Sequence, residues 1–235
     1  MPSPATKSPR SRADGRPGFP PGTAAEPSRD CPLCPRLAEF REEWREKEPS
    51  WHNAPVPSFL PAGGPESVKL LVVGLAPGLR GANRTGRPFT GDYAGDLLYA
   101  TLTRFGFANG RFDARTDDGL ELIGAAITNS VRCVPPQNKP VGGEINACRP
   151  FLSATIDQLP NLAAIITLGK IAHDSTVRTL GGRVAAHPFR HNGFSDLAGV
   201  RLFSSYHCSR YNTNTGRLTT EMFEAVFADA AAFLG

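Results

Sequence analysis

Short apolar runs alternate along the chain with longer stretches that have helical spacing. The apolar runs cover residues 68–73, 122–133, 161–170 and 200–207 and are bounded by glycine, proline or polar positions. Runs of this kind, closed by turn-forming residues, predict buried strands. Helices are predicted over residues 34–49, 92–107, 143–159, 170–180 and 218–234, and Asp92 suits the start of the second of them.

This alternation of strands and helices predicts an α/β fold with a mostly parallel, four-stranded sheet covered on both faces. Ligands of such sheets bind beyond the carboxyl ends of the strands. Here those ends carry the segments GLAPG (74–78), TNSVRC (128–133), TLGK (167–170) and SYHCSRYN (205–212). We therefore expect the functional site at this edge of the sheet, built from these four segments.

The first thirty residues differ in composition from the rest of the chain. They are rich in proline, serine, glycine and arginine and contain almost no large apolar side chains. A segment of this composition cannot bury enough apolar surface to order itself. We therefore predict a disordered tail over residues 1–30 and one folded domain over residues 31–235.

The overall composition sets limits on location and partners. Apolar residues make up 40% of the chain, but no run is long enough to span a membrane and the N-terminus has no apolar signal region. A cytoplasmic location is expected, where structural disulfides are rare. The net charge of +4 permits an anionic partner without requiring one.

Four of the five cysteines form a set that suggests metal chemistry. Cys31 and Cys34 form a C-x-x-C pair, Cys133 follows a predicted strand, and Cys148 lies early in a predicted helix. Such thiols can hold a four-iron, four-sulfur cluster or a zinc ion, or can simply be buried without a ligand. Spacing favours them in that order. Cys208 stands outside the set and is expected to be a packing residue.

Four segments together resemble family 5 of the uracil-DNA glycosylase superfamily, the type called UDGb. They are GLAPG (74–78), GANRTGRPFTGD (81–92), TNSVRCVPPQNKP (128–140) and YHCSRYNTNTGRLT (206–219). The resemblance covers residues 31–235 and implies a three-layer α/β/α sandwich that excises uracil from DNA. It also implies a structural 4Fe-4S cluster on Cys31, Cys34, Cys133 and Cys148, which would clasp the N-terminal segment to the loop after the second strand.

The resemblance also implies roles for individual residues. Phe89 would stack on a base flipped from the DNA, and the Asn129 amide would read the edge of uracil. His207 would donate a hydrogen bond to O2 as the glycosidic bond breaks. GLAPG carries no acidic side chain, and Asp92 in the neighbouring segment is the nearest carboxylate to it. Asp92 is therefore the candidate for a catalytic or sugar-positioning role. Base-binding residues would be Gly74, Ala76, Gly78, Phe89, Asn129 and His207.

The loop after His207 and the neighbouring arginines are candidates for DNA contact. Glycine-rich turns let backbone N–H groups approach phosphates, and guanidinium groups attract them. Tyr211 is the candidate wedge that fills the gap left by the flipped base. The full set is Arg84, Arg87, Ser209, Arg210, Tyr211, Asn212, Asn214, Gly216 and Arg217.

The sequence predicts an enzyme but leaves alternative functions open. A monomeric enzyme that acts on DNA with deaminated bases is expected, and family 5 is also associated with hypoxanthine and xanthine. The alternative is an iron–sulfur protein that binds uracil-DNA without cutting it, or that traps it covalently. A Cys208–His207 nucleophile pair is disfavoured, because neighbours on a strand point to opposite faces.

Overall fold

A central sheet of five strands organises the protein, whose computed structural model describes residues 25–235. The spatial order is β4-β1-β5-β7-β6, and every neighbouring pair is parallel except β6 with β7. The strands are β1 (Leu70–Gly74), β4 (Ala125–Asn129), β5 (Ala164–Leu168), β6 (Gly193–Leu197) and β7 (Val200–Ser205). The predicted α/β class and the mostly parallel sheet are therefore confirmed.

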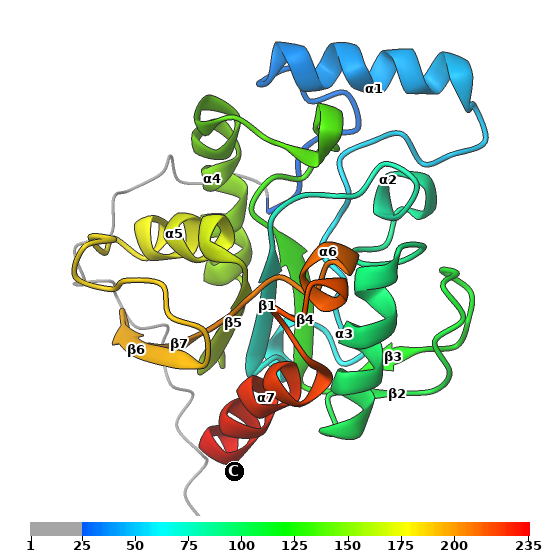
Figure 1. Cartoon of the computed structure of the whole chain (residues 1–235). Coiled ribbons are helices and arrows are strands. Elements are labelled where there is room, and N and C mark those ends of the chain that lie inside the picture. Colours follow the sequence, from blue (N-terminus) through cyan, green and yellow to red (C-terminus); the bar gives the residue numbers. More distant parts are fainter. Residues whose placement is uncertain (1–24) are drawn as a thin grey trace, which may run out of the picture.

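Helices cover both faces of this sheet and give three layers (Figure 1). On one face, Leu70 and Val72 of β1 join a core with α3 (Tyr93–Arg104) and α7 (Thr220–Leu234). On the other face, Leu71 and Val73 join a core with α4 (Gly142–Asp157) and α5 (Lys170–Thr179). Successive residues of β1 thus point to opposite layers, as a strand buried on both sides requires.

The remaining elements lie at the edges of the sandwich. Helix α1 (Pro35–Lys47) packs above the carboxyl ends of the strands, near the start of α4 (Figure 1). Short elements complete the chain: η1 (Pro65–Ser67), α2 (Ala82–Thr85), the pair β2 (Ala108–Asn109) with β3 (Glu121–Leu122), η2 (Pro136–Asn138) and α6 (Arg210–Asn214).

The prediction of four strands was wrong, because β6 forms a fifth at the edge of the sheet. It pairs with β7 through a two-residue turn, Ala198–Gly199, in which both residues have positive φ, 51° and 79°. Turns of this type match the twist of a hairpin. The sequence GFSDL gave no apolar run, since only one face of this edge strand is covered.

The predicted boundary of the N-terminal tail was also wrong in part. Residues 1–24 of the predicted tail lie outside the described part of the chain. Within residues 25–30, Ala25 is buried and Glu26 accepts hydrogen bonds from the Ser58 amide and the Arg132 guanidinium. The folded domain thus begins before Cys31. No helix within the described residues is long and apolar enough to cross a membrane.

Candidate active site

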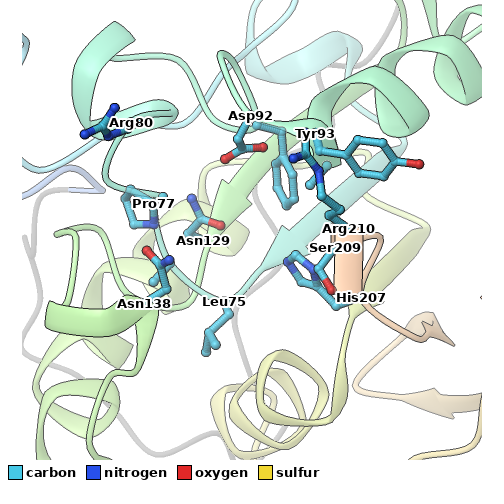
Figure 2. Close-up of a pocket in the computed structure, with 14 residues that line it drawn as sticks. Leu75, Pro77, Arg80, Asp92, Tyr93, Asn129, Asn138, His207, Ser209 and Arg210 are labelled. Atoms are coloured by element: carbon cyan, nitrogen blue, oxygen red, sulfur yellow. The ribbon is translucent and has the colours of Figure 1, made fainter. Parts of the chain in front are cut away.

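A cavity of about 640 Å³ opens at the carboxyl ends of β1, β4 and β7, where the sequence placed the site (Figure 2). The loop after β1, the loop into α3, the end of β4, the η2 turn and the start of α6 all contribute to its wall. The lining residues are Leu75, Ala76, Pro77, Gly78, Arg80, Phe89, Asp92, Tyr93, Ala94, Asn129, Asn138, His207, Ser209 and Arg210. Segments far apart in sequence therefore meet around one pocket.

Asn129 ends β4 and presents its amide to this pocket. The residue is 3% exposed, and its Oδ1 atom is buried without a hydrogen-bond partner. A buried acceptor of this kind is unfavourable unless a ligand satisfies it. Its neighbour in register is Gly74, where a Cβ would lie 2.4 Å from Asn129 Oδ1 and 2.6 Å from Phe89 Cζ. Gly74 does not line the cavity but leaves room for the two side chains that do.

Phe89 forms an aromatic wall of the pocket and is held there by an unusual backbone conformation. Its φ of 53° is rare for a residue with a bulky side chain. The neighbouring peptide groups hold this turn: the Tyr99 hydroxyl donates to Pro88 O at 2.6 Å, and Gly95 admits the Phe89 carbonyl, which a Cβ there would meet at 1.9 Å. Strain of this kind persists where surrounding structure fixes a functional side chain.

His207 lies two residues beyond the end of β7, opposite the Phe89 ring. The two ring centroids are 6.0 Å apart with 30° between the planes. Burial lowers the pKa of His207 to about 4, so the imidazole is neutral at pH 7. A neutral ring keeps one N–H donor for a ligand. The next residue, Cys208, is fully buried with its thiol donating to Ala94 O at 3.5 Å, so the two side chains are not a reactive pair.

Asp92 places a carboxylate at the rim of the pocket, in the turn that starts α3. Burial raises its pKa, although the backbone amides of Gly95 and Ala94 oppose this shift. Its Oδ1 atom is buried without a partner, as is Asn129 Oδ1. Gly78 and Gly81 make space for it, since a Cβ at either would lie 2.8 Å or 2.3 Å from Asp92 Oδ2. Among the described residues, this carboxylate forms no ion pair.

Asn138 is a lining residue that the sequence interpretation did not single out. It follows Gln137 in the η2 turn, and both have positive φ, 56° and 57°. Figure 2 shows its amide on the same side of the pocket as Asn129, below Pro77. The signal was in the quoted motif VPPQNKP, because asparagine tolerates left-handed backbone better than most residues. Leu75, Pro77, Arg80, Tyr93 and Ala94 were likewise not predicted.

The predicted DNA-contacting loop is partly a short helix. Ser209 caps α6, and its hydroxyl accepts a hydrogen bond from the backbone N–H of Asn212 at 3.4 Å. Ser209 and Arg210 reach the pocket, and the Arg210 guanidinium lies 5.2 Å from the centre of the Tyr93 ring. Tyr211 is 73% exposed beside them.

The other predicted DNA contacts have different surroundings. Asn212 donates to His207 O at 2.8 Å, and the Arg217 guanidinium stacks 4.8 Å from the Tyr206 ring. Arg84 lies on the surface of α2 with Nε bonded to Arg80 O at 2.9 Å, and Asn214 and Gly216 are exposed at the end of α6.

The expected contact between Arg87 and DNA is inconsistent with the place of this side chain. Arg87 is 6% exposed and forms two hydrogen bonds to the Asp118 carboxylate, at 2.9 Å and 2.6 Å. Its Nε donates to Thr90 Oγ1 at 2.8 Å, and the guanidinium lies within 6 Å of three aromatic rings. Arg87 instead supports the turn that carries Phe89.

The four cysteines predicted as ligands line one small second cavity. Pro27, Cys31, Cys34, Cys133 and Cys148 belong to its wall, which is otherwise apolar. Burial raises the pKa of Cys133 to about 12 and that of Cys148 to about 11. Between residues 25 and 235, no group of three or more His, Cys, Asp or Glu side chains is spaced to hold a single metal ion.

Two contacts connect this cysteine cavity to its surroundings. The backbone N–H of Arg132 donates to Cys148 Sγ at 3.3 Å. Arg36, beside Cys34, forms hydrogen bonds of 2.7 Å and 2.8 Å to both oxygens of Glu144 on α4. The segment that carries the C-x-x-C pair is thereby joined to the helix that carries Cys148.

Comparison with known proteins identifies the class. The sequence model of the uracil DNA glycosylase superfamily matches residues 61–231, and the chain belongs to this superfamily. Within it, the chain belongs to the family whose members are named type-5 uracil-DNA glycosylases, which confirms the resemblance found in the sequence.

Three relatives illustrate how much of the chain is shared. A type-5 uracil-DNA glycosylase of Thermus thermophilus is 44% identical over 87% of this chain and 94% of its own length. One of Mycobacterium leprae is 41% identical over 87% and 92%. One of Pyrobaculum aerophilum is 37% identical over 88% and 90%. The similarity therefore covers nearly the whole of each of these proteins.

Proposed function

We propose that this protein excises uracil from DNA by hydrolysing the N-glycosidic bond and leaving an abasic site. One observation carries the proposal beyond family membership. The pocket holds two buried oxygen atoms without partners, Asn129 Oδ1 and Asp92 Oδ1, next to an aromatic wall. A flipped base and its sugar supply a flat surface, an N–H donor and developing positive charge, which match these three features.

Recognition of the base is assigned to the Phe89 ring and to the side-chain amides of Asn129 and Asn138. The base stacks on Phe89, and the Asn129 amide pairs with the uracil edge, accepting from N3–H and donating to O4. Cytosine presents the opposite arrangement on that edge, so the same amide cannot satisfy both bases without reorienting. Asn138 supplies a second amide on the same side, available to a carbonyl oxygen of the base.

Departure of the base is assisted by His207. Negative charge develops on the uracil ring as the bond to C1′ breaks, and a donor held in place lowers the barrier. Removing such a donor costs about 3 kcal/mol, or 100-fold or more in rate. Because burial keeps the imidazole uncharged, its N–H can donate to the base without the cost of removing a charged ring from water.

Asp92 is assigned to the sugar side of the reaction. Positive charge develops on the deoxyribose while the base leaves, and an unpaired carboxylate stabilises it or orients the attacking water. The carboxylate must be ionised for either role. Because its pKa is raised, excision is expected to weaken as the pH falls through that raised value.

The range of bases is proposed to include hypoxanthine and xanthine. The cavity of about 640 Å³ is large enough for a purine, and amides can accept and donate to the lactam edge that these bases share with uracil. Single-turnover assays on inosine- and xanthosine-containing duplexes test this range. Release no faster than the background restricts the enzyme to uracil.

DNA binding is proposed to follow the rim formed by Arg80, Ser209, Arg210 and Tyr211. The two arginines are exposed at the mouth of the pocket, where they attract phosphates flanking the flipped nucleotide. The exposed ring of Tyr211 is proposed as the wedge that enters the base stack. Tyr211→Ala should slow excision from duplex DNA more than from a single strand, and equal rates on both would remove this role.

A structural 4Fe-4S cluster on Cys31, Cys34, Cys133 and Cys148 is proposed for the second cavity. The residues fit the group, because four thiol sulfurs line one cavity and a backbone N–H already points at Cys148 Sγ. When bound, the cluster supplies cross-links between segments rather than chemistry on the base. Visible absorbance with iron and sulfide analysis tests this, and stoichiometric zinc without sulfide would refute it.

The decisive experiment is single-turnover excision of uracil by the wild type and by Asn129→Ala, Asn138→Ala, His207→Ala and Asp92→Ala. Each substitution should slow the reaction by roughly 10-fold to 1,000-fold. Asn161→Ala is the matched control, since within residues 25–235 this exposed amide bonds only Glu66 O, on the opposite edge of the sheet. Tight binding of uracil-DNA by the wild type without an abasic product, or a covalent adduct, would replace the hydrolase with a binding protein.

A further inference from the structure

Arg41 is a buried cation beside the cysteine cavity, and no buried carboxylate of residues 25–235 pairs with it. It lies on α1 and is 3% exposed. Its Nη1 atom donates to Cys31 O at 3.3 Å and lies 4.0 Å from Cys133 Sγ. Its Nε atom is buried and makes no hydrogen bond. A charge removed from water in this way is strongly unfavourable unless an opposite charge compensates it.

The nearest carboxylates do not supply that compensation. Glu42 Oε1 lies 3.5 Å from Arg41 Nε, but this carboxylate is 56% exposed and forms a closer ion pair of 2.8 Å with Arg45. Asp30 is also exposed and pairs with Arg45 at 2.7 Å. Both acids therefore belong mainly to the surface network of Arg45, and water screens their attraction to Arg41.

A second buried arginine near the cysteines shows what a compensated charge looks like here. Arg132 is 1% exposed and donates to Glu26 Oε2 at 2.9 Å, to Ser58 Oγ at 2.9 Å and to Thr155 Oγ1 at 2.7 Å. Its Nε is also buried without a hydrogen bond, but its charge has a carboxylate partner and two hydroxyl acceptors. Among the described residues, Arg41 has only a carbonyl oxygen and a sulfur atom as hydrogen-bond acceptors, and its single carboxylate contact is the longer one to the exposed Glu42.

We infer that Arg41 is the charge partner of the metal–thiolate group held by the four cysteines, and that it sets how readily this group accepts an electron and how firmly it is retained. The inference rests on the proposed cluster. Four thiolates around an iron–sulfur core carry net negative charge, which a guanidinium beside Cys133 offsets. Net charge and hydrogen bonds to the sulfurs are the main determinants of the reduction potential of such clusters.

The test uses the full chain with Arg41→Gln, Arg41→Lys and Arg45→Gln. Arg45 is the matched control, because the same change on the same helix removes a guanidinium already paired with two carboxylates. For each protein, iron and sulfide content, the midpoint potential and the rate of cluster loss to a chelator are measured. Arg41→Gln should lower the reduced-to-oxidised ratio at a fixed potential about tenfold, which is 59 mV for one electron, and should lose the cluster faster.

The remaining variants keep the inference falsifiable. Arg45→Gln should match the wild type in both measurements. If Arg41→Gln is not recovered folded, Arg41→Lys decides: its compact ammonium keeps the charge but loses the forked contacts, so the ratio should fall about threefold. Potentials and loss rates equal to the control overturn the role of Arg41 alone. Wild-type protein without iron and sulfide overturns the proposed cluster and Arg41 with it.

Discussion

The base pocket and the cysteine cavity both adjoin the segment at the end of β4, from Asn129 to Cys133, and are built in opposite ways. The base pocket, beside Asn129, is large and leaves polar oxygens without partners. The cysteine cavity, beside Cys133, is small, and its wall is apolar apart from the thiols. A site that binds and releases a ligand needs polar atoms that have no hydrogen-bond partner inside the protein. A site for a permanently bound group can instead be enclosed by packed apolar side chains.

This difference extends to the arginines near each cavity. Arg87, behind the base pocket, is neutralised by Asp118 and serves the backbone turn of Phe89. Arg41, behind the cysteine cavity, has no hydrogen-bonded carboxylate and faces sulfur. The same residue type therefore supports a backbone turn through a buried ion pair in one place, and in the other carries a buried charge whose only carboxylate contact is the exposed Glu42 at 3.5 Å, within the described residues.

The largest expected effect comes from removing the support of the base pocket. Arg87→Gln leaves the buried Asp118 carboxylate without its cation, which should lower the free energy of unfolding by about 3–5 kcal/mol. Urea denaturation measures this loss. Burial opposes ionisation of Asp118, but its bonds from Arg87 hold the pKa well below the usual value. In the wild type this stabilisation is present above about pH 4 and declines at lower pH, a decline that should be largely absent from the variant.

Filling the base pocket without touching the cysteine cavity is the next test. Gly74→Ala should slow uracil excision by about 100-fold, since the new methyl group displaces Asn129 and Phe89. Gly143→Ala is the control, because a Cβ there meets nothing within 4 Å. Iron content should be unchanged in both proteins. Wild-type excision by Gly74→Ala would mean that these two side chains do not set the geometry of the reaction.

Two cysteine substitutions separate the cavities from the other side. Cys133→Ser should lose the cluster and lower the unfolding free energy by at least about 2 kcal/mol, or about 4–8 °C in Tm. Cys208→Ser should retain both the cluster and most of the activity, since this thiol contacts only the core. Iron analysis and thermal unfolding measure the two effects, and an equal loss in both variants would contradict the separation.

The smallest expected effect is a titration that should not occur. The pKa of His207 is lowered to about 4, so its imidazole should stay neutral between pH 8 and pH 5. Because the unfolded chain takes up this proton near pH 6.5, His207 should reduce stability as the pH falls from there toward 4. Nitrogen chemical shifts of the ring follow the charge, and protonation near pH 6.5 would show that the pocket does not desolvate it.

Much of the fold could be predicted from the chain, for identifiable reasons. The four core strands are short apolar runs, and the stretches between them have the residue spacing of helices. Strands that alternate with helices predict a mostly parallel sheet, which the structure has. The edge strand β6 was missed because GFSDL has only two large apolar residues, separated by two polar ones, and so shows neither an apolar run nor a strict alternation. Ser209–Asn214 was interpreted as a loop, although Ser209 is a good helix cap, because its polar residues do not form an amphipathic pattern.

The candidate site was predicted from the residues at the strand ends and from the segment GANRTGRPFTGD before α3. Ala76, Gly78, Phe89, Asp92, Asn129 and His207 line one pocket, as the quoted segments suggested. Asn138 was missed because its place depends on a left-handed turn that brings it back toward β1. Arg87 was misassigned because a guanidinium in a polar motif looks the same whether it faces DNA or Asp118.

The sequence by itself determined the order of the elements, the edge that carries the site and the four cysteines, since all of these depend on local pattern and spacing. Tertiary structure alone decided which polar groups have partners. Asp118 lies 31 residues from Arg87 and neutralises it, whereas Asn129 Oδ1 and Arg41 Nε form no hydrogen bond within the described chain. Pairing and desolvation depend on neighbours that are distant in sequence. They determine whether a polar group supports the fold, as Arg87 does, or has no internal partner and can bind a ligand, as Asn129 does.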